Sequence, residues 1–310
     1  MKTIMLGRTG ITTTIAGLGC GGHSKIGLEK YGVAHAAGIA RKAYDLGVRF
    51  FDTATAYGTE AALGEGLRDF SRESYVISTK FPVWNELRKD AINKFNETLD
   101  VSLKALKTDY IDIYNFHAVL SEDYKDVTEL LMPEMIKAQE RGKIRFPGIT
   151  EQFLNDSSHK MLDLALADDI FDVIMVGYNM MNPSAAKDIL PRAIKQNVGV
   201  QCMFAVRRAL SDKAQMKKDI QKVLDHRQGG EGLEADERAL DFLLPAAESI
   251  MDAAYRFCAN KEGIHVTLTG TSSDAHLASN LRSIEAAQLP VDILEKLEKL
   301  FGLSDCVCGE

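Results

Sequence analysis

The chain alternates short apolar runs with longer segments in which apolar residues recur every three or four positions. Runs of the first kind predict buried β-strands, and segments of the second kind predict helices that bury one face. Two β-prone pieces, 3–6 and 11–14, flank the turn Gly7-Arg8-Thr9-Gly10 and predict an N-terminal hairpin. Strand-then-helix pairs follow, with strands at 15–19, 48–51, 75–79, 110–116, 144–148, 173–178, 198–203 and 266–269, and helices at 33–46, 60–70, 89–106, 127–141, 157–166, 185–196, 245–261 and 274–287.

This order of elements predicts a particular architecture. Strands that are apolar throughout, rather than at alternate residues, are typical of a parallel sheet covered by helices. Glycine follows three predicted helices, at Gly47, Gly142 and Gly263, where it commonly ends a helix. We therefore expect an α/β protein with a (β/α)8 TIM barrel, an N-terminal β-hairpin and an extra C-terminal helix at 291–301, formed by one domain over residues 1–310.

An open, doubly wound sheet is the alternative fold. It requires a Gly-x-Gly-x-x-Gly turn after the first strand, and the sequence Gly-Leu-Gly-Cys-Gly-Gly at 17–22 nearly provides one. That fold also needs an acidic residue at the end of the second strand to bind a ribose. Asp52 lies about ten residues too far along the chain for this role, so the barrel is favoured.

One segment interrupts the alternation of strands and helices. About 40 residues, 204–244, separate the seventh strand from its helix and include the basic pair Arg207-Arg208. A long segment at the catalytic end of a barrel is usually a lid or a ligand-binding loop. A solvated helical excursion also fits its charge.

Composition excludes several functional classes. The 310 residues carry a formal net charge of -7, with 45% hydrophobic and 26% charged residues, as in ordinary soluble proteins. The acidic balance argues against a nucleic-acid or membrane partner, and no stretch matches a membrane span or a secretory signal, so we expect a cytoplasmic protein. The five cysteines are scattered, which favours reduced thiols. Cys306 and Cys308 have no second pair beside them, so no metal site is predicted.

Four titratable residues follow three neighbouring strands of the predicted barrel. Asp52 ends the second strand, Tyr57 lies in the loop beyond it, Lys80 follows the third strand and His117 the fourth. Each alone is more simply explained as a cap, a rim aromatic, a strand terminus or a core imidazole. Together they indicate an active site, because active sites of such barrels lie at the C-terminal ends of the strands. A buried Asp52–Lys80 pair beside Tyr57 is expected to lower the pKa of the phenol and make it a better acid, while His117 polarises a carbonyl oxygen.

The same residues belong to motifs that occur in a fixed order. They are Leu-Gly-Arg-Thr-Gly at 6–10, Phe-Asp-Thr-Ala at 51–54 followed by Tyr-Gly at 57–58, Ser-Thr-Lys at 78–80, and Asp-Tyr-Ile-Asp-Ile-Tyr at 109–114 followed by His117. In order and spacing the chain resembles the aldo-keto reductase superfamily over nearly its whole length. The resemblance implies a (β/α)8 barrel that reduces aldehydes and ketones with NADPH, less often NADH. It implies Tyr57 as the general acid/base, Lys80 as its modulator, Asp52 as the partner of Lys80, and His117 as the group that positions the carbonyl.

The resemblance also implies a cofactor site, NADP(H) with NAD(H) as the alternative, in which several positions depart from the family pattern. Glu151 stands where an asparagine is usual and Met175 where a glutamine is common, while His276 and Ser279 replace a frequent arginine and glutamate. Glycine and backbone amides that open a helix suit a phosphate. The expected cofactor-binding residues are Gly21, Thr150, Tyr178, Met203, Phe204, Gly270, Thr271, Ser272, His276 and Asn280.

The predicted function is therefore an NAD(P)H-dependent oxidoreductase acting on a small-molecule carbonyl or alcohol. Hydride moves from the nicotinamide C4 while Tyr57 donates the proton, and His23, Phe81 and Trp84 are candidate walls of the substrate pocket. Two alternatives remain open. Lys80 could act as a Schiff-base nucleophile in an aldolase, or the chain could be a cofactor-binding sensor with little turnover.

Overall fold

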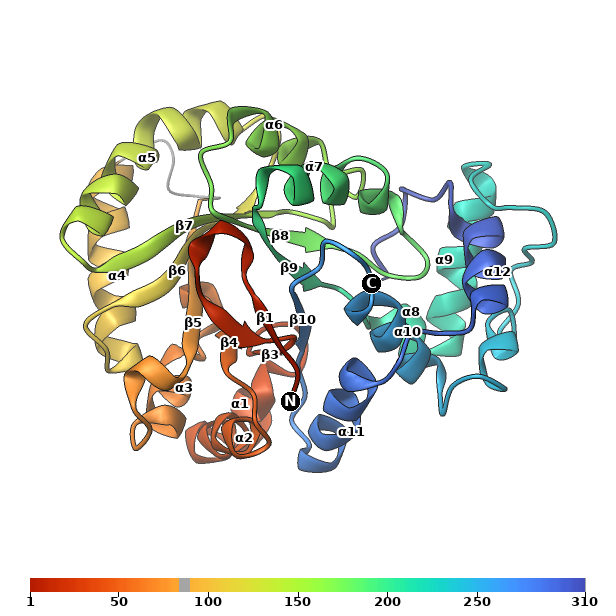
Figure 1. The fold of residues 1–310 in the computed structure, drawn as a ribbon, viewed down its shortest axis with the longest axis horizontal. Coiled ribbons are helices and arrows are strands. Elements are labelled where there is room, and N and C mark those ends of the chain that lie inside the picture. Colours follow the sequence, from red (N-terminus) through yellow and green to blue (C-terminus); the bar gives the residue numbers. More distant parts are fainter. Residues whose placement is uncertain (84–89, 310) are drawn as a thin grey trace.

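A computed structural model describes residues 1–83 and 90–309 (Figure 1). Within these ranges eight parallel strands close into a barrel in the order β10-β3-β4-β5-β6-β7-β8-β9, which confirms the predicted barrel and excludes the open sheet. The strands are β3 (Ala16–Gly19), β4 (Phe50–Asp52), β5 (Val76–Pro82), β6 (Ile111–Val119), β7 (Ile144–Glu151), β8 (Val173–Gly177), β9 (Gly199–Met203) and β10 (Val266–Thr269).

Helices surround the barrel and bury their apolar faces against the outside of the strands. They are α1 (Leu28–Tyr31), α2 (Val33–Asp45), α3 (Glu60–Leu67), α4 (Ala91–Leu106), α5 (Tyr124–Glu140), α6 (Lys160–Asp168), α7 (Ile189–Gln196), α10 (Ile250–Ala259) and α11 (Asp274–Glu285). Short 3-10 helices are η1 (Gly7–Thr9), η2 (Lys25–Gly27), η3 (Thr55–Tyr57), η4 (Arg72–Ser74), η5 (Ser184–Ala186) and η6 (Asp241–Leu243). Gly47, Gly142 and Gly263 have the positive φ that was expected after helices.

The N-terminal hairpin closes the barrel at the ends where the strands begin. β1 (Thr3–Met5) and β2 (Thr12–Thr14) pair antiparallel, as predicted. Leu6 and Ile11, in the turn between them, are buried. They form one apolar cluster with residues that point into the barrel near the beginning of its strands, among them Phe50 and Ile113. The opposite end of the barrel is therefore the end left for chemistry.

The segment after β9 is helical and builds a second apolar cluster outside the barrel. It contains α8 (Arg208–Ser211) and α9 (Lys213–Asp225), and it packs with the final helix α12 (Val291–Phe301), which has the predicted bounds. Figure 1 shows α9 and α12 together at one side of the barrel. Gly230 donates its N–H to Leu300 O at 2.9 Å, which ties the segment to α12. No helix among the described residues has both the length and the apolar character needed to cross a membrane.

Candidate active site

Tyr57 is presented by a tight turn directly after β4. The strand ends at Asp52, and the chain then turns through η3, which ends at Gly58 with a φ of 73°. A residue with a side chain rarely adopts that φ, so the glycine explains why the turn stops there. The hydroxyls of Thr53 and Thr59 lie 2.9 Å apart and tie the two ends of the turn together. Tyr57 is thereby held at the mouth of the barrel, partly buried.

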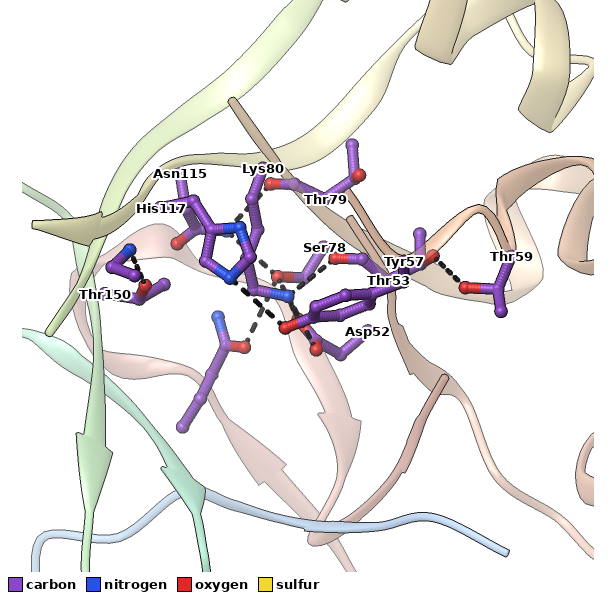
Figure 2. A network of polar contacts seen from close by, with 12 residues as sticks. Asp52, Thr53, Tyr57, Thr59, Ser78, Thr79, Lys80, Asn115, His117 and Thr150 are labelled. Atoms are coloured by element: carbon purple, nitrogen blue, oxygen red, sulfur yellow. Dashed lines mark hydrogen bonds and ion pairs between the residues drawn. The ribbon is translucent and has the colours of Figure 1, made fainter. Parts of the chain in front are cut away.

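Lys80 and Asp52 form an ion pair in the barrel interior (Figure 2). Lys80 Nζ lies 2.7 Å from both carboxylate oxygens of Asp52 and 2.6 Å from Thr53 O. All three ammonium protons therefore have acceptors. Both side chains are almost fully buried, with 0% and 5% exposed, so each charge depends on the other.

His117 completes the group around the tyrosine. Its Nε2 lies 3.3 Å from Tyr57 Oη, and the two rings are nearly perpendicular at 83°. Lys80 Nζ lies 5.0 Å from the centroid of the Tyr57 ring. The structure thus brings together Asp52, Tyr57, Lys80 and His117, the four residues expected from the ends of three strands.

The electrostatic surroundings of these groups contradict the expected pKa of Tyr57. Burial raises the pKa of Tyr57 above its ordinary value, and the positive charge of Lys80 only partly opposes this rise. The expected lowering of the Tyr57 pKa is therefore wrong in this structure. Burial lowers the pKa of His117 well below its usual range, and Lys80 adds to that effect, so the imidazole is neutral near pH 7. Burial also opposes the charge of Lys80, but Asp52 outweighs it and the pKa of Lys80 is raised.

A cleft of about 580 Å³ opens beside Tyr57. Its lining includes most residues expected to bind the cofactor, as well as His23. Those cofactor residues are Gly21, Met203, Phe204, Gly270, Thr271, His276 and Asn280. Gly270 and Thr271 lead into the N-terminus of α11, where backbone N–H groups are available to an anion. The helix start beside this cleft suits a ligand that carries a phosphate.

Three other expected cofactor residues lie outside the cleft lining. Thr150 is buried and accepts a hydrogen bond from the Ala118 N–H at 2.7 Å. Tyr178 follows the inward Gly177, points away from the barrel interior and stacks on Phe257, with ring centroids 5.3 Å apart. The backbone of Ser272 contacts His35 Nε2 at 2.9 Å.

The expected substrate-pocket residues have different outcomes. Phe81 is fully buried and makes an edge contact with Phe95 of α4, so the expectation that it lines the pocket is wrong. The reason is the alternation of a strand: Lys80 points into the barrel, so its neighbour Phe81 points to the helices. Trp84 lies outside the described residues.

Glu151 does not face the cleft. Its carboxylate is fully buried, contacts His159 Nδ1 at 2.9 Å and accepts the Gly177 N–H at 2.7 Å. His159 Nε2 contacts Ser184 Oγ at 3.0 Å on its other side. Glu151, which departs from the family pattern, thus pairs with His159 in the interior and links β7 to β8 through its hydrogen bond with Gly177.

Two further groups of residues lie near the site. The first belongs to the 204–244 segment, for which the sequence offered a lid or ligand-binding loop, and the second was not predicted. Arg207, Arg208 and Ser211, from the segment after β9, line one part of the cleft. The second group is a buried polar set beneath the tyrosine, Ser78, Asn115 and Gln201. A signal for it exists, because these residues stand two positions before Lys80, His117 and Met203 and so share their inward side of the strands. In the described part of the chain no cluster of three or more His, Cys, Asp or Glu residues can hold a metal ion.

Known proteins resemble this chain in sequence and fold. The Aldo/keto reductase family model matches residues 18–301. L-Galactose dehydrogenase of Arabidopsis thaliana is 30% identical over 202 residues, 63% of this chain and 62% of that protein. Probable aldo-keto reductase 1 of Glycine max is 24% identical over 208 residues, 64% of this chain and 58% of that protein. The matched part therefore spans less than two thirds of either relative.

Solved structures share the fold over nearly the whole chain. An aldo-keto reductase from Klebsiella pneumoniae in complex with NADPH superposes with a TM-score of 0.69 at 20% identity, covering 99% of this chain and 98% of that one. The holo form of an aldo-keto reductase from Bacillus halodurans gives a TM-score of 0.72 at 21% identity, covering 99% and 97%. These likenesses establish the (β/α)8 fold.

Proposed function

The chain belongs to the aldo/keto reductase family, and we propose that it is an oxidoreductase that reduces an aldehyde or ketone to an alcohol, or catalyses the reverse reaction, with NADP(H) or NAD(H). The observation that carries the proposal is the hydroxyl of Tyr57, which borders an open cleft while an ion pair and a neutral imidazole lie behind it. The bound nicotinamide supplies or accepts the hydride.

Tyr57 is the proposed proton donor. Its raised pKa keeps the phenol protonated at neutral pH, so it is ready to give a proton to an oxygen that gains negative charge. Lys80 lies close enough to stabilise the phenolate that remains, because its ammonium is fixed by Asp52 and cannot turn away. The pair thus acts on the transition state more than on the resting enzyme.

His117 is the proposed carbonyl-positioning group. A neutral imidazole can donate one hydrogen bond and does not compete with Lys80 for the charge of the phenolate. Its Nε2 and the Tyr57 hydroxyl are 3.3 Å apart, so a single oxygen can contact both. That oxygen would lie beside the cleft that Tyr57 lines.

The cleft offers contacts for the nicotinamide and for a phosphate of the cofactor. Met203 and Phe204 lie at the end of β9, beside the tyrosine, and suit the nicotinamide ring. The guanidinium of Arg207 lies 3.9 Å from the centroid of the Phe204 ring, and the Phe153 ring packs against it at 74° with centroids 5.3 Å apart, so the ring is held in place. Gly270 and Thr271, at the start of α11, suit a phosphate, and His276 and Asn280 border the same end. His276 carries less positive charge than an arginine, so both NADPH and NADH require testing.

The Schiff-base alternative is disfavoured by the contacts of Lys80. A nucleophilic lysine must be neutral and reachable by substrate. Lys80 is 0% exposed, all its protons are accepted by Asp52 and Thr53, and its pKa is raised. The sensor alternative differs from the enzyme only in turnover, so a rate measurement decides between them.

The test compares wild type with Tyr57→Phe against a panel of aldehydes, using NADPH and NADH in turn. Loss of a general acid is expected to lower kcat/KM by about 100-fold or more, while cofactor binding persists. Tyr110→Phe is a matched control, because Tyr110 precedes β6 and lies at the far end of the barrel. Equal activity of wild type and Tyr57→Phe would contradict the mechanism. If neither NADPH nor NADH binds, the oxidoreductase proposal itself is contradicted.

A further inference from the structure

A layer of polar side chains lies inside the barrel directly beneath the proposed catalytic group. Ser78, Asn115 and Gln201 come from β5, β6 and β9, and each is 0% exposed. The next inward layer toward the hairpin is apolar. Burial of polar groups at this depth is unfavourable unless they bond to one another or to a charge.

Ser78 is the centre of this layer. Its Oγ donates to Asp52 Oδ1 at 3.0 Å and receives a hydrogen bond from Asn115 Nδ2 at 3.1 Å. It also lies 3.3 Å from Gln201 Oε1, which reaches it from the opposite side of the barrel. Three strands therefore meet at one hydroxyl, and that hydroxyl touches the carboxylate that holds Lys80 (Figure 2).

A count of protons decides how Gln201 is oriented. A serine hydroxyl has a single proton, and the carboxylate of Asp52 is the stronger acceptor. Ser78 therefore cannot also donate to Gln201 Oε1. Gln201 Nε2, meanwhile, has no hydrogen-bond partner in the described part of the chain. Turning the amide by half a rotation places Nε2 against Ser78 Oγ, where it donates, and removes the conflict.

We propose that Ser78, Asn115 and Gln201 are positioning residues that act on the reaction through Asp52. Asn115 and Gln201 both donate to Ser78, which directs the Ser78 proton to Asp52 and strengthens that bond. Gly148 makes room for this arrangement, because a Cβ atom there would lie 2.2 Å from Asn115 Oδ1. The inference rests on the proposed function, in which Asp52 fixes Lys80 and Lys80 stabilises the phenolate of Tyr57.

The carboxylate needs this support because little else in its surroundings favours its charge. The titratable groups around it are Lys80 from β5, Tyr57 from η3 and Cys20 after β3, with His117 from β6 beside Lys80. Among these only Lys80 is a cation. Burial raises the pKa of Asp52, and Lys80 and Ser78 oppose that rise. Removing the Ser78 hydroxyl leaves Lys80 as the one side-chain donor to the Asp52 carboxylate in the described part of the chain.

The first test is the pH dependence of kcat/KM in Ser78→Ala. A lost hydrogen bond to a charged group should raise the pKa of Asp52. The acid limb of the pH profile, where kcat/KM falls as Asp52 is protonated, should therefore move to higher pH by roughly one unit, and kcat/KM measured on that limb should fall about tenfold. Ser78→Thr keeps the hydroxyl and should restore the acid limb. Thr267→Val is the control, since Thr267 is equally buried on β10 but belongs to neither layer. An unmoved acid limb in Ser78→Ala, or an equal shift in Thr267→Val, would overturn the proposal.

The second test asks whether Gln201 acts through Ser78. Gln201→Leu should move the acid limb in the same direction by a smaller amount. Added to Ser78→Ala, it should cause no further loss, because the hydroxyl that transmits its effect is already absent. Fully additive losses would overturn the role of Gln201.

A third readout does not depend on activity. Ser78→Ala should lower the urea midpoint of unfolding more at about pH 8 than at about pH 5, because only the charged carboxylate loses a stabilising donor. If wild type reduces no carbonyl but this difference is present, the proposed function fails and the positioning layer stands. If wild type is active and the difference is absent, the layer has no such role.

Discussion

At the scale of single residues, the chemistry of Tyr57 depends on how the charge of Lys80 is shared. The ammonium contacts both oxygens of Asp52, so the phenol faces an ion pair rather than a lone cation. The field of a pair falls off faster than that of one charge, and burial then outweighs it and raises the Tyr57 pKa. Sequence reasoning identified the three residues but gave the pKa shift the wrong sign, because burial depth is not readable from spacing.

The pH profile of carbonyl reduction follows from these shifts. His117 has a pKa well below 6.5 and Tyr57 a pKa above 10.0, so neither should titrate between those values. We expect kcat/KM for reduction to be flat across that interval and to fall at alkaline pH as Tyr57 loses its proton. A midpoint inside the interval that disappears in His117→Gln would contradict the neutral, buried imidazole.

The same shift of His117 affects stability. The unfolded chain binds a proton at His117 near pH 6.5, and the folded chain does so only at lower pH. Stability should therefore rise with pH through this region and be lost as the pH falls below about 6.5. The free energy of unfolding of wild type and His117→Gln, measured with denaturant at several pH values, tests this pH dependence. An equally steep acid loss in both proteins would assign the effect to other groups.

Gly21 provides a steric test of the tyrosine's position. A Cβ atom at Gly21 would lie 2.6 Å from the Tyr57 ring, so Gly21→Ala must displace the ring. A displacement of this kind should lower kcat by about 100-fold. Gly38→Ala is the matched control, because that exposed glycine in α2 has nothing within 4 Å of an added Cβ. It should keep full activity and gain about 0.5–1 kcal/mol of stability. Full activity in Gly21→Ala would show that the ring has freedom to move.

At the scale of elements, strand alternation explains which sequence predictions succeeded. Inward residues of β5, β6 and β9 were correctly placed near the strand ends. Phe81 of β5 and Tyr178, which directly follows β8, instead point outward and face the helices. The end of a strand could be predicted within a few residues, but a side chain changes face with every single residue. Helix starts show the same limit. α10 begins at Ile250 rather than 245, because Ser249 caps it by accepting the Asp252 N–H.

The buried pair of Glu151 and His159 gives a prediction for the link between β7 and β8. Glu151→Asn restores the residue that the family pattern favours, yet it should not tighten NADPH, because this side chain faces His159 and Gly177. It should lower the free energy of unfolding by about 3–5 kcal/mol, the usual cost of breaking a buried pair. Glu262→Asn, on an exposed residue, should change it by less than about 0.5 kcal/mol. Tighter NADPH binding by Glu151→Asn would show that the carboxylate does reach the cofactor.

At the scale of the whole molecule, the two ends of the barrel have separate tasks. The hairpin end is sealed by Leu6 and Ile11 against apolar strand residues, and the other end carries the cleft. Repetition of strand and helix made this architecture predictable from the sequence, since the pattern recurs along the chain. The second cluster formed by α9 and α12 was not predictable, because it depends on contacts between segments far apart in sequence.

This separation predicts that stability and catalysis can be changed independently. Leu6→Ala removes a fully buried side chain at the sealed end and should lower the free energy of unfolding by about 2–5 kcal/mol. Because it lies at the opposite end from Tyr57, kcat/KM should stay within about twofold at temperatures where the protein is folded. Met5→Ala, which alters an exposed neighbour, is the control for stability. A large fall in kcat/KM for Leu6→Ala would mean that the two ends are coupled.

The central claim is that hydride transfer in this barrel depends on the proton of Tyr57. The most direct measurement supplies nicotinamide cofactor deuterated at C4, in the form whose deuterium is transferred, together with an aldehyde, and follows deuterium in the alcohol by mass spectrometry. The account predicts one deuterium in the alcohol formed by wild type, and about 100-fold slower formation of that product by Tyr57→Phe with the cofactor still bound. An alcohol without deuterium, or equal rates in the two proteins, would contradict it.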